Sequence, residues 1–443
     1  MHSERREALA QRVLSFCEGD ESEVSIFADR SELTRFTHNA VHQNVSSEDV
    51  TVRIRAVVDG RTGVAASNIL DDEHLREAAH RALEMAKLAP RDPDRPPMEK
   101  GSTSPPPPNP YAETTANATP AQRAQMCDHI FKVAQQHDLW CAGFVRTGAG
   151  GFTIVNSAGT QDSFDSTDSS INVKMNGPDS SGFAEQFDRN VEAIDAGDVA
   201  TRAADKANQS ANPVAVDPGA WTVIMEPVAF GELLMYLTTH FSAQSFAEGS
   251  SFLTGELGNH ILSDNVTILD DYRNPLNPGA PFDYEGIATQ RVTLIDSGIA
   301  RDVVTDSYWA RKLGRPNTGH ALPAPNAWGP QARHLTVATG NKSTEQLIAE
   351  TEKGLLITRF WYIRTVDEKK AIVTGMTRDG TFLIENGQLK GGVRNMRFNH
   401  SIISALQNVE FGNAAHRTGG YSYDTAVPSA KIAGFTFSSG TDF

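Results

Sequence analysis

The feature that most constrains the fold of this chain is a proline-rich break between two segments with the same order of predicted elements. The break runs from Pro90 to Pro110 and contains four consecutive prolines. Proline lacks an amide donor and fixes φ, so the break is predicted to be an extended surface connector. On each side we predict a helix, strands, a glycine-containing turn, a further strand and an alanine-rich helix. The order indicates a weak internal duplication over residues 5–90 and 120–212.

Hydrophobic patterns in the two segments support the duplication. Apolar side chains alternate along Val50–Val58 and along Ser169–Met175, as in half-buried strands. They recur at helical spacing over residues 72–88 and 196–210, where most of the apolar positions are alanine. Shorter strands are predicted at Val24–Phe27, Leu33–Phe36, Phe144–Arg146 and Phe152–Asn156.

After Asn212 the pattern changes to short strands separated by turn residues. Asp296-Ser297-Gly298 and Asn386-Gly387 are predicted hairpin turns, and Ser343 is predicted to begin a short helix that ends at Lys353-Gly354. The predicted fold class is therefore α+β. We expect an N-terminal α/β domain over residues 1–212 and a C-terminal β-rich, sheet- or barrel-like domain over residues 213–443.

Composition excludes several classes of protein. The formal net charge is −15 over 443 residues, which argues against a nucleic-acid surface. Neither a long apolar run nor a secretory signal is visible, so we expect no membrane span and no export. The three cysteines, an odd number, fit reduced thiols better than disulfides. Together these features predict a cytoplasmic protein.

The most informative stretch for chemistry is an apolar helix predicted over Phe230–Ser242, which ends near His240. A hydrolytic zinc site needs three protein ligands, an open position for water and usually a carboxylate base. Glu232 lies eight residues before His240, too far for both to hold one metal ion. His260 or His416 could approach His240 only through tertiary folding. By itself, the pattern favours a structural histidine.

Other candidate residues have structural explanations that are at least as good. Gly319 and His320 lie in an irregular segment with several prolines, where a hydrogen-bonded loop histidine is expected. Asp283 and Glu285 lie in one short turn, where acidic residues usually cap strands and turns. A self-sufficient hydrolase that uses His240, His320 and His416 remains an alternative.

Several segments of the second half match the sequence blocks of one known family. They are P-F-D-Y-E-G-I-A-T-Q-R at Pro281–Arg291, S-Y-W-A-R-K-L-G at Ser307–Gly314, N-T-G-H-A at Asn317–Ala321, L-I-E-N-G at Leu383–Gly387, N-M-R-F at Asn395–Phe398 and V-P-S-A-K-I-A-G-F-T-F at Val427–Phe437. In this order and spacing, the chain resembles the TldD/PmbA family, and specifically its PmbA (TldE) branch. The N-terminal half agrees with that family in architecture only. The matched family-motif positions include Asp283, Glu285, Gly286, Gly319 and His320.

The resemblance implies a two-domain protein that takes part in a cytoplasmic peptidase complex. In that family the TldD-type subunit carries zinc on an H-E-x-x-x-H helix with a C-terminal cysteine. The PmbA-type subunit lacks this site and completes the cavity in which unfolded peptides are cut. Here the helix motif falls on Met235, Tyr236 and His240, and the cysteine position falls near Ala414, two residues from His416.

These substitutions predict that this chain is not the zinc-bearing subunit. A thioether is a poor zinc ligand beside carboxylate and imidazole, and a tyrosine with a pKa near 10 is a poor water-activating base. We therefore expect no catalytic residue and no metal in this chain, with zinc in a TldD-like partner. The expected assembly is a heterodimer or a larger complex that handles unfolded peptides. A homodimer, including a homodimeric peptide-binding scaffold without peptidase activity, is the alternative.

Overall fold

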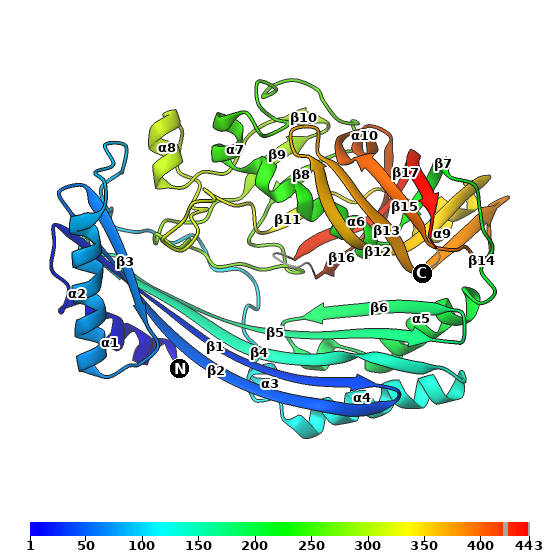
Figure 1. Ribbon diagram of the computed structural model, residues 1–443, viewed down its shortest axis with the longest axis horizontal. Coiled ribbons are helices and arrows are strands. Elements are labelled where there is room, and N and C mark those ends of the chain that lie inside the picture. Colours follow the sequence, from blue (N-terminus) through cyan, green and yellow to red (C-terminus); the bar gives the residue numbers. More distant parts are fainter. Residues whose placement is uncertain (420–423, 442–443) are drawn as a thin grey trace.

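Two β-sheets face each other across the molecule (Figure 1). The computed structural model describes residues 1–419 and 424–441. A long curved sheet is built from the N-terminal half, and a larger mixed sheet with short helices is built from the C-terminal half (Figure 1). The predicted α+β class is confirmed. Within the described residues, no helix is long and apolar enough to span a bilayer.

The first sheet has six antiparallel strands in the order β3-β2-β1-β4-β5-β6. Its strands are β1 (Glu21–Thr37), β2 (Ala40–Val58), β3 (Arg61–Ser67), β4 (Trp140–Asn156), β5 (Gln161–Asn176) and β6 (Ser181–Asp188). The prediction of two short strands at Val24–Phe27 and Leu33–Phe36 is wrong, because both belong to β1. The polar residues between them resemble a break, yet β2 and β4 pair with them on both sides and the strand continues.

Five helices accompany this sheet, and helices and strands together occur twice in the same order. They are α1 (Ser3–Leu14), α2 (Asp72–Leu88), α3 (Glu113–Ala116), α4 (Pro120–Gln136) and α5 (Ala196–Gln209). The order α1-β1-β2-β3-α2 recurs as α4-β4-β5-β6-α5, apart from one turn of 3₁₀ helix, η1 (Val191–Ala193). The two series of elements meet where β1 pairs with β4.

Glycine explains why the apolar faces of α2 and α5 are rich in alanine. A Cβ atom on Gly63 of β3 would lie 2.1 Å from the carbonyl oxygen of Ala82 in α2. A Cβ atom on Gly182 of β6 would likewise lie 2.1 Å from the carbonyl oxygen of Ala203 in α5. Each copy therefore places a helix backbone against a strand glycine, which only small residues on both surfaces permit.

The C-terminal sheet is mixed, and β17 pairs with four other strands. Its strands are β7 (Gly219–Met225), β8 (Ile268–Asp270), β9 (Val292–Asp296), β10 (Ile299–Ala300), β11 (Leu335–Val337), β12 (Lys353–Asp367), β13 (Ile372–Glu385), β14 (Gln388–Gly392), β15 (Met396–Ser401), β16 (Val409–Thr418) and β17 (Thr425–Gly440). Several of these strands are longer than the short strands predicted. β17 contacts β7, β11, β15 and β16, so the C-terminal segment completes the sheet.

Short helices and turns connect these strands. The helices are α6 (Pro227–Leu234), η2 (Met235–Phe241, a 3₁₀ helix), α7 (Ala243–Glu248), α8 (Ser307–Leu313), α9 (Thr344–Ala349) and α10 (Ile402–Gln407). The turns at Asp296-Ser297-Gly298 and Asn386-Gly387 are confirmed. So is the Ser343 capping box of α9. That helix ends at Ala349 rather than at Lys353-Gly354, because β12 begins at Lys353.

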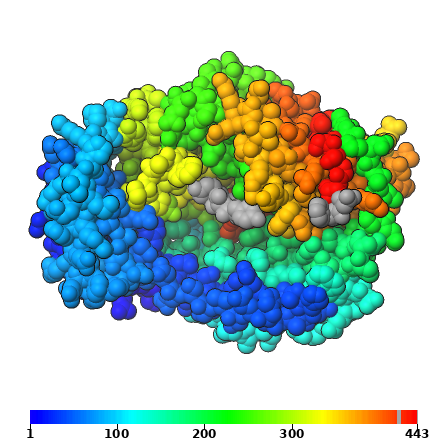
Figure 2. All heavy atoms as spheres, viewed as in Figure 1, coloured from blue at the N-terminus to red at the C-terminus, as the bar shows by residue number. Residues whose placement is uncertain are grey.

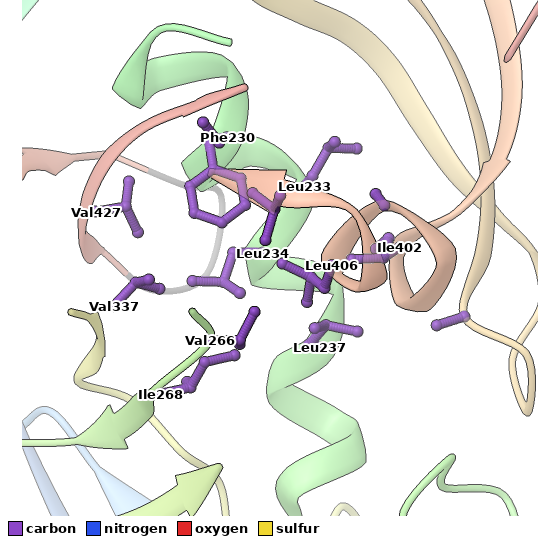
Figure 3. Packing of buried hydrophobic residues seen from close by; sticks show 14 of the residues in the cluster. Phe230, Leu233, Leu234, Leu237, Val266, Ile268, Val337, Ile402, Leu406 and Val427 are labelled. Atoms are coloured by element: carbon purple, nitrogen blue, oxygen red, sulfur yellow. The ribbon is translucent and has the colours of Figure 1, made fainter. Parts of the chain in front are cut away.

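The main hydrophobic core of this half surrounds α6 and η2. Figure 3 shows Phe230, Leu233, Leu234 and Leu237 directed toward side chains from strands, from the loop before β8 and from α10. Those partners include Val266, Ile268, Val337, Ile402, Leu406 and Val427. All of these residues are buried, so α6 is fixed in position by packing on several sides.

The proline-rich connector lies along the C-terminal half. The amide of Ser102 donates to Gly286 O at 3.0 Å, and the amide of Ser104 donates to Pro281 O at 2.9 Å. The hydroxyl of Tyr272 donates to Pro105 O at 3.0 Å. The connector therefore holds a fixed path beside the loop that begins at Pro281.

Candidate functional site

The stretch predicted as one helix over Phe230–Ser242 consists of two kinds of helix. The α-helix α6 ends at Leu234, and the tighter η2 continues to Phe241. The Thr238 hydroxyl donates to Met235 O at 2.8 Å, which satisfies a carbonyl at the end of the α-helix. The prediction of a continuous α-helix is therefore wrong in its second half. Hydrophobic spacing alone did not distinguish the two windings.

Each of the three motif positions in this stretch is used in packing or hydrogen bonding. The Tyr236 hydroxyl donates to Ile363 O at 2.7 Å, and Met235 caps α6. His240 is buried, its Nδ1 accepts a long bond from the Phe252 amide at 3.4 Å, and the two rings lie 5.3 Å apart. Burial lowers the pKa of His240 to about 4, so the ring is neutral at pH 7.

The side chains at these positions do not fit a hydrolytic zinc centre. They supply a thioether, a phenol already bonded to a carbonyl, and one buried imidazole. His416 lies on β16 in register with Val427 and is exposed, as is Ala414. Within residues 1–419 and 424–441, no group of three or more His, Cys, Asp or Glu side chains could hold a metal ion.

Sequence reasoning missed a cluster of charged residues where the two sheets meet. We call it the inter-sheet charge cluster, and it contains Lys174, Glu185, Glu232, Arg359 and Asp379. Glu232 of α6 accepts from the Phe360 amide at 2.6 Å and lies 3.5 Å from Arg359 Nη2. Arg359 stacks over the ring of Phe183 on β6, 4.2 Å from its centroid. The cluster therefore connects α6 to the first sheet.

The other members of the cluster complete this contact. Asp379 is buried and accepts from Lys174 Nζ at 2.8 Å and from the Ser181 hydroxyl at 2.9 Å. Glu185 accepts from the Gly419 amide at 3.2 Å. A polar cavity of 780 Å³ borders the cluster and is lined in part by Lys174, Ser181 and Asp379.

Two carboxyl groups of the cluster have displaced pKa values. Burial raises the pKa of Glu185 to about 8, although the Gly419 amide favours the ionised form. Burial also raises the pKa of Glu232 to about 7, against the opposing effect of Arg359. Both groups therefore carry a proton for a substantial part of the time near neutral pH.

A second ionic contact lies beside the first. Arg417 of β16 binds Asp168 of β5 at 2.7 Å and is also paired with Asp424. Arg189 lies 3.5 Å from the same Asp168 carboxylate. The sequence alone could not predict this contact, because Asp168 and Arg417 are far apart in the chain and share no local pattern.

The structure brings the family-motif residues together at a structural joint. The Asp283 carboxylate accepts from the amides of Glu285, Ile287 and Ala321. It therefore links the loop after Pro281 to the loop that contains Ala321. Burial and the Glu285 charge raise the pKa of Asp283, while those amides oppose the rise. Glu285 accepts from the Ser307 amide at the start of α8 and lies 3.8 Å from Arg55 of β2. The joint therefore contacts the first sheet.

The two motif glycines are required by this geometry. Gly286 has φ 76°, and a Cβ atom there would lie 2.5 Å from Thr160 Cγ2 of the N-terminal half. Gly319 has φ 70°, and a Cβ atom there would lie 2.3 Å from Ala288 O. Both positions combine a left-handed backbone with close approach, which favours glycine.

His320 belongs to a buried polar chain beside the joint. Its Nδ1 lies 2.8 Å from Thr318 O, and its Nε2 lies 3.2 Å from Asp270 Oδ1. Both ring nitrogens therefore face oxygen atoms of neighbouring residues. Burial alone would raise the pKa of Asp270, yet His320 and His334 hold it at about 2.

Comparison with known proteins assigns the family. The family model described as "PmbA/TldA metallopeptidase C-terminal domain" matches residues 218–439, and "PmbA/TldA metallopeptidase domain 1" matches residues 22–86. The chain belongs to the PmbA/TldD family, which has a metallopeptidase-related fold. This assignment confirms the resemblance seen in the sequence blocks.

Two curated relatives and one solved structure show the extent of the similarity. The chain is 29% identical over 230 residues to "Metalloprotease PmbA" of Escherichia coli O157:H7, which covers 49% of this chain and 48% of that protein. It is 28% identical over 196 residues to "Metalloprotease PmbA homolog" of Haemophilus influenzae, which covers 42% of this chain and 39% of that protein. The chain thus spans less than half the length of these curated relatives.

The similarity in fold extends over the whole chain. The crystal structure of TldE from Thermococcus kodakarensis superposes with a TM-score of 0.88 and covers 98% of this chain and 99% of that one. Sequence identity over this superposition is 21%, so the likeness concerns the fold.

Proposed function

We propose that this chain is a PmbA/TldE-like, non-zinc subunit of a TldD/TldE-type metallopeptidase complex in the cytoplasm, with unfolded peptides as substrates. The observation that carries the proposal is that the residues at the three motif positions are engaged in structural contacts. Met235 supplies only a thioether and forms the C-cap of α6 through its backbone, Tyr236 bonds to a backbone carbonyl, and His240 is buried against Phe252. None of these side chains is presented for water activation.

The arrangement of the two sheets supports a role in enclosing a peptide. Figure 2 shows a hollow between the first sheet and the C-terminal half. Strand edges and polar side chains can hold an extended peptide by adding it to a sheet, without reading its full sequence. In this proposal the TldD-like subunit supplies zinc and cuts the peptide, while this chain closes the space around it.

The test is co-purification with a TldD-like subunit, followed by a peptidase assay on an unfolded peptide. We expect a complex in size-exclusion chromatography and cleavage only when both chains are present. As a control, His240→Ala should leave cleavage by the complex intact at a temperature where the variant stays folded. A TldD-like subunit that never associates with this chain, and cuts equally well alone, would refute the proposal.

The alternative of a self-sufficient hydrolase receives less support. Thr318, His320 and Asp270 form a chain of the kind seen in hydrolytic triads, but the Thr318 hydroxyl donates to Thr305 O and is buried. A nucleophile needs access to substrate. Stoichiometric zinc in the purified chain, lost in His240→Ala, would favour this alternative. Binding of unfolded peptide by the chain alone, without cleavage, would favour a scaffold.

A further inference from the structure

The polar cavity of 780 Å³ beside the inter-sheet charge cluster lies where the chain passes from one half to the other. Its walls come from the turn between β5 and β6 (residues 176–181), the segment after α5 (residues 210–213), β13 (residues 379–381) and the segment before β15 (residues 393–395). Figure 1 shows the segment after α5 leaving the first sheet beside β14. A molecule in this cavity would therefore touch both halves and the segment that joins them.

Backbone hydrogen bonds hold these walls in place. The Val214 amide donates to Gly392 O and the Arg394 amide donates to Val214 O, both at 2.9 Å. The Ser210 hydroxyl donates to Ser181 O of β6, also at 2.9 Å. A site whose walls are already ordered loses less conformational entropy when a ligand binds.

Positive charge gathers at this cavity. Asp379 is the buried carboxylate of the lining, and three cations surround it: Lys174 at 2.8 Å, Arg359 at 3.8 Å and Arg378 at 3.9 Å. Arg394 is a fourth cation and is exposed at the cavity. Within residues 1–419 and 424–441, its guanidinium has neither an ion pair nor a hydrogen bond.

The other nearby acids do not cancel this excess of positive charge. Glu232 and Glu185 lie beside Arg359, but burial raises the pKa of Glu232 to about 7 and that of Glu185 to about 8. Both carboxyl groups are therefore incompletely ionised at neutral pH. Asp179 lies at the exposed rim and accepts from the Asn212 amide at 3.1 Å. The balance of charge favours an anionic ligand.

The neutral groups of the lining suit a ligand that carries hydroxyl groups. The Ser180 hydroxyl and the Asn212 side-chain amide face no hydrogen-bonding partner in the described part of the chain. Among the described residues that line the cavity, none is aromatic, so a planar ring would find no stacking partner. A hydroxylated chain can exchange hydrogen bonds with serine and asparagine. The volume lies within the range of roughly 300–1,000 Å³ that is usual for small-molecule sites.

We propose that this cavity binds a small polyhydroxylated anion, of the class of sugar acids and sugar phosphates. The charged group of the ligand pairs with Arg394 and Lys174, and its hydroxyl groups bond to Ser180 and Asn212. The bound anion bridges the two halves and restrains the segment that joins them. This inference does not depend on a TldD-like subunit, so its failure would leave the proposed function untouched.

The experiment is isothermal titration calorimetry of the full chain at constant ionic strength. The probes are gluconate, glucose 6-phosphate, uncharged glucose and inorganic phosphate. We expect at least one of the two polyol anions to bind with a Kd below about 1 mM, and glucose and inorganic phosphate to bind at least about tenfold more weakly. A preference for gluconate identifies a carboxylate site, and a preference for glucose 6-phosphate identifies a phosphate site.

Two variants and one control test the residues. Arg394→Gln should weaken binding about tenfold or more, because it removes the unpaired guanidinium. Ser180→Ala should weaken binding by about threefold to tenfold through loss of one hydrogen bond. Arg397→Gln is the matched control, since Arg397 is exposed on β15 and lies outside the lining, and it should change the Kd by less than about twofold. Circular dichroism checks that all three variants remain folded.

Hydrogen–deuterium exchange locates the bound anion. The ligand should slow amide exchange in residues 176–181 and 210–214 and leave residues 40–51 of β2 unchanged. Failure of both polyol anions to bind would overturn the proposal, as would equal binding of glucose or of inorganic phosphate. Undiminished binding by Arg394→Gln, or protection confined to other segments, would overturn it as well.

Discussion

At the residue scale, the buried contact between Asp270 and His320 is the strongest candidate for a single stabilising pair. Both side chains are buried, and Asp270 also accepts from the His334 amide at 3.0 Å. Replacement of the buried Asp270 carboxylate removes a charge that the groups facing it are arranged around.

We predict that Asp270→Asn lowers the free energy of unfolding by about 3–5 kcal/mol. The matched control is Asp296→Asn, which removes the exposed pair with Arg301 at 2.8 Å and should cost less than about 1 kcal/mol. Urea denaturation measures both values. Equal effects for the two variants would contradict a buried ion pair at Asp270.

Glu185 predicts a pH dependence of stability. Its pKa is raised to about 8 in the folded chain, above its ordinary value of 4.5, so the folded state holds a proton that the unfolded state releases. This contribution is complete below pH 4.5 and is lost as the pH rises through about 8. The free energy of unfolding should therefore fall with rising pH in this window, by at most about 1.4 kcal/mol per unit for one proton.

The corresponding variant is Glu185→Gln, which should make the fall between pH 5 and pH 8 shallower, by up to about 1.4 kcal/mol per pH unit, because glutamine cannot titrate. Glu192→Gln, at an exposed position nearby in the chain, should leave the slope as it is in the wild-type protein. Urea titrations at several pH values provide the comparison. A slope that is unchanged in Glu185→Gln would assign the whole effect to other groups, with Glu232 the first to examine.

Site residues were predictable only where chemistry was encoded locally. The prediction that this chain holds no zinc rests on Met235 and Tyr236, which the family resemblance places at the motif positions and which do not suit that role. Conversely, the bonds of Glu185 to Gly419 and of Asp168 to Arg417 join positions far apart in the chain. No local spacing contains that information, because it arises only when the two sheets pack.

At the scale of elements, the position of α6 depends on a glycine. A Cβ atom on Gly231 would lie 2.1 Å from Thr418 Oγ1 of β16 and 2.8 Å from Thr425 Oγ1 of β17. The two hydroxyls lie 3.0 Å apart and are buried, so they have little room to move. The helix therefore rests directly on the β16–β17 pair.

We predict that Gly231→Ala lowers the free energy of unfolding by about 1–3 kcal/mol, even though alanine favours helices, because the added methyl group overpacks this contact. Gly391→Ala on β14 is the control, since its Cβ atom would meet nothing within 4 Å. Thermal unfolding of both variants measures the difference. A stabilised Gly231→Ala chain would show that α6 can shift away from β16.

Elements were predictable where the pattern was local and strong. The helices over residues 72–88 and 196–209 and the turn at Asn386-Gly387 follow from periodicity and turn chemistry. The full length of β1 could not be predicted from such patterns, because its polar centre is held in the strand by pairing with β2 and β4 on either side. Pairing partners, rather than propensity, decide such a strand.

At the scale of the whole molecule, aromatic packing couples the two halves. Phe282 is buried against Phe152 of β4, with ring centroids 5.8 Å apart, and Tyr284 contacts the same ring at 4.8 Å. These contacts accompany the bond between Glu285 and the start of α8. The loop after Pro281 thus holds the first sheet to the C-terminal half.

We predict that Phe282→Ala costs about 3–5 kcal/mol and separates the unfolding of the two halves into distinct calorimetric transitions. Phe398→Ala is the matched control, because Phe398 is equally buried but lies within the C-terminal core. Phe398→Ala should lower stability without separating the unfolding of the two halves into distinct transitions. A single cooperative transition in Phe282→Ala would show that other contacts suffice to couple the halves.

The antiparallel pairing of β1 with β4 also affects the chain during its synthesis. β4 ends roughly 70 residues after α2, so at about 5–20 residues per second the ribosome needs about 3–14 s to supply it. In that interval the α1-β1-β2-β3-α2 segment has emerged with one side of β1 unpaired. Nascent chains on one polysome carry the same open edge at the same time. That edge therefore remains open to pairing between neighbouring nascent chains until β4 emerges.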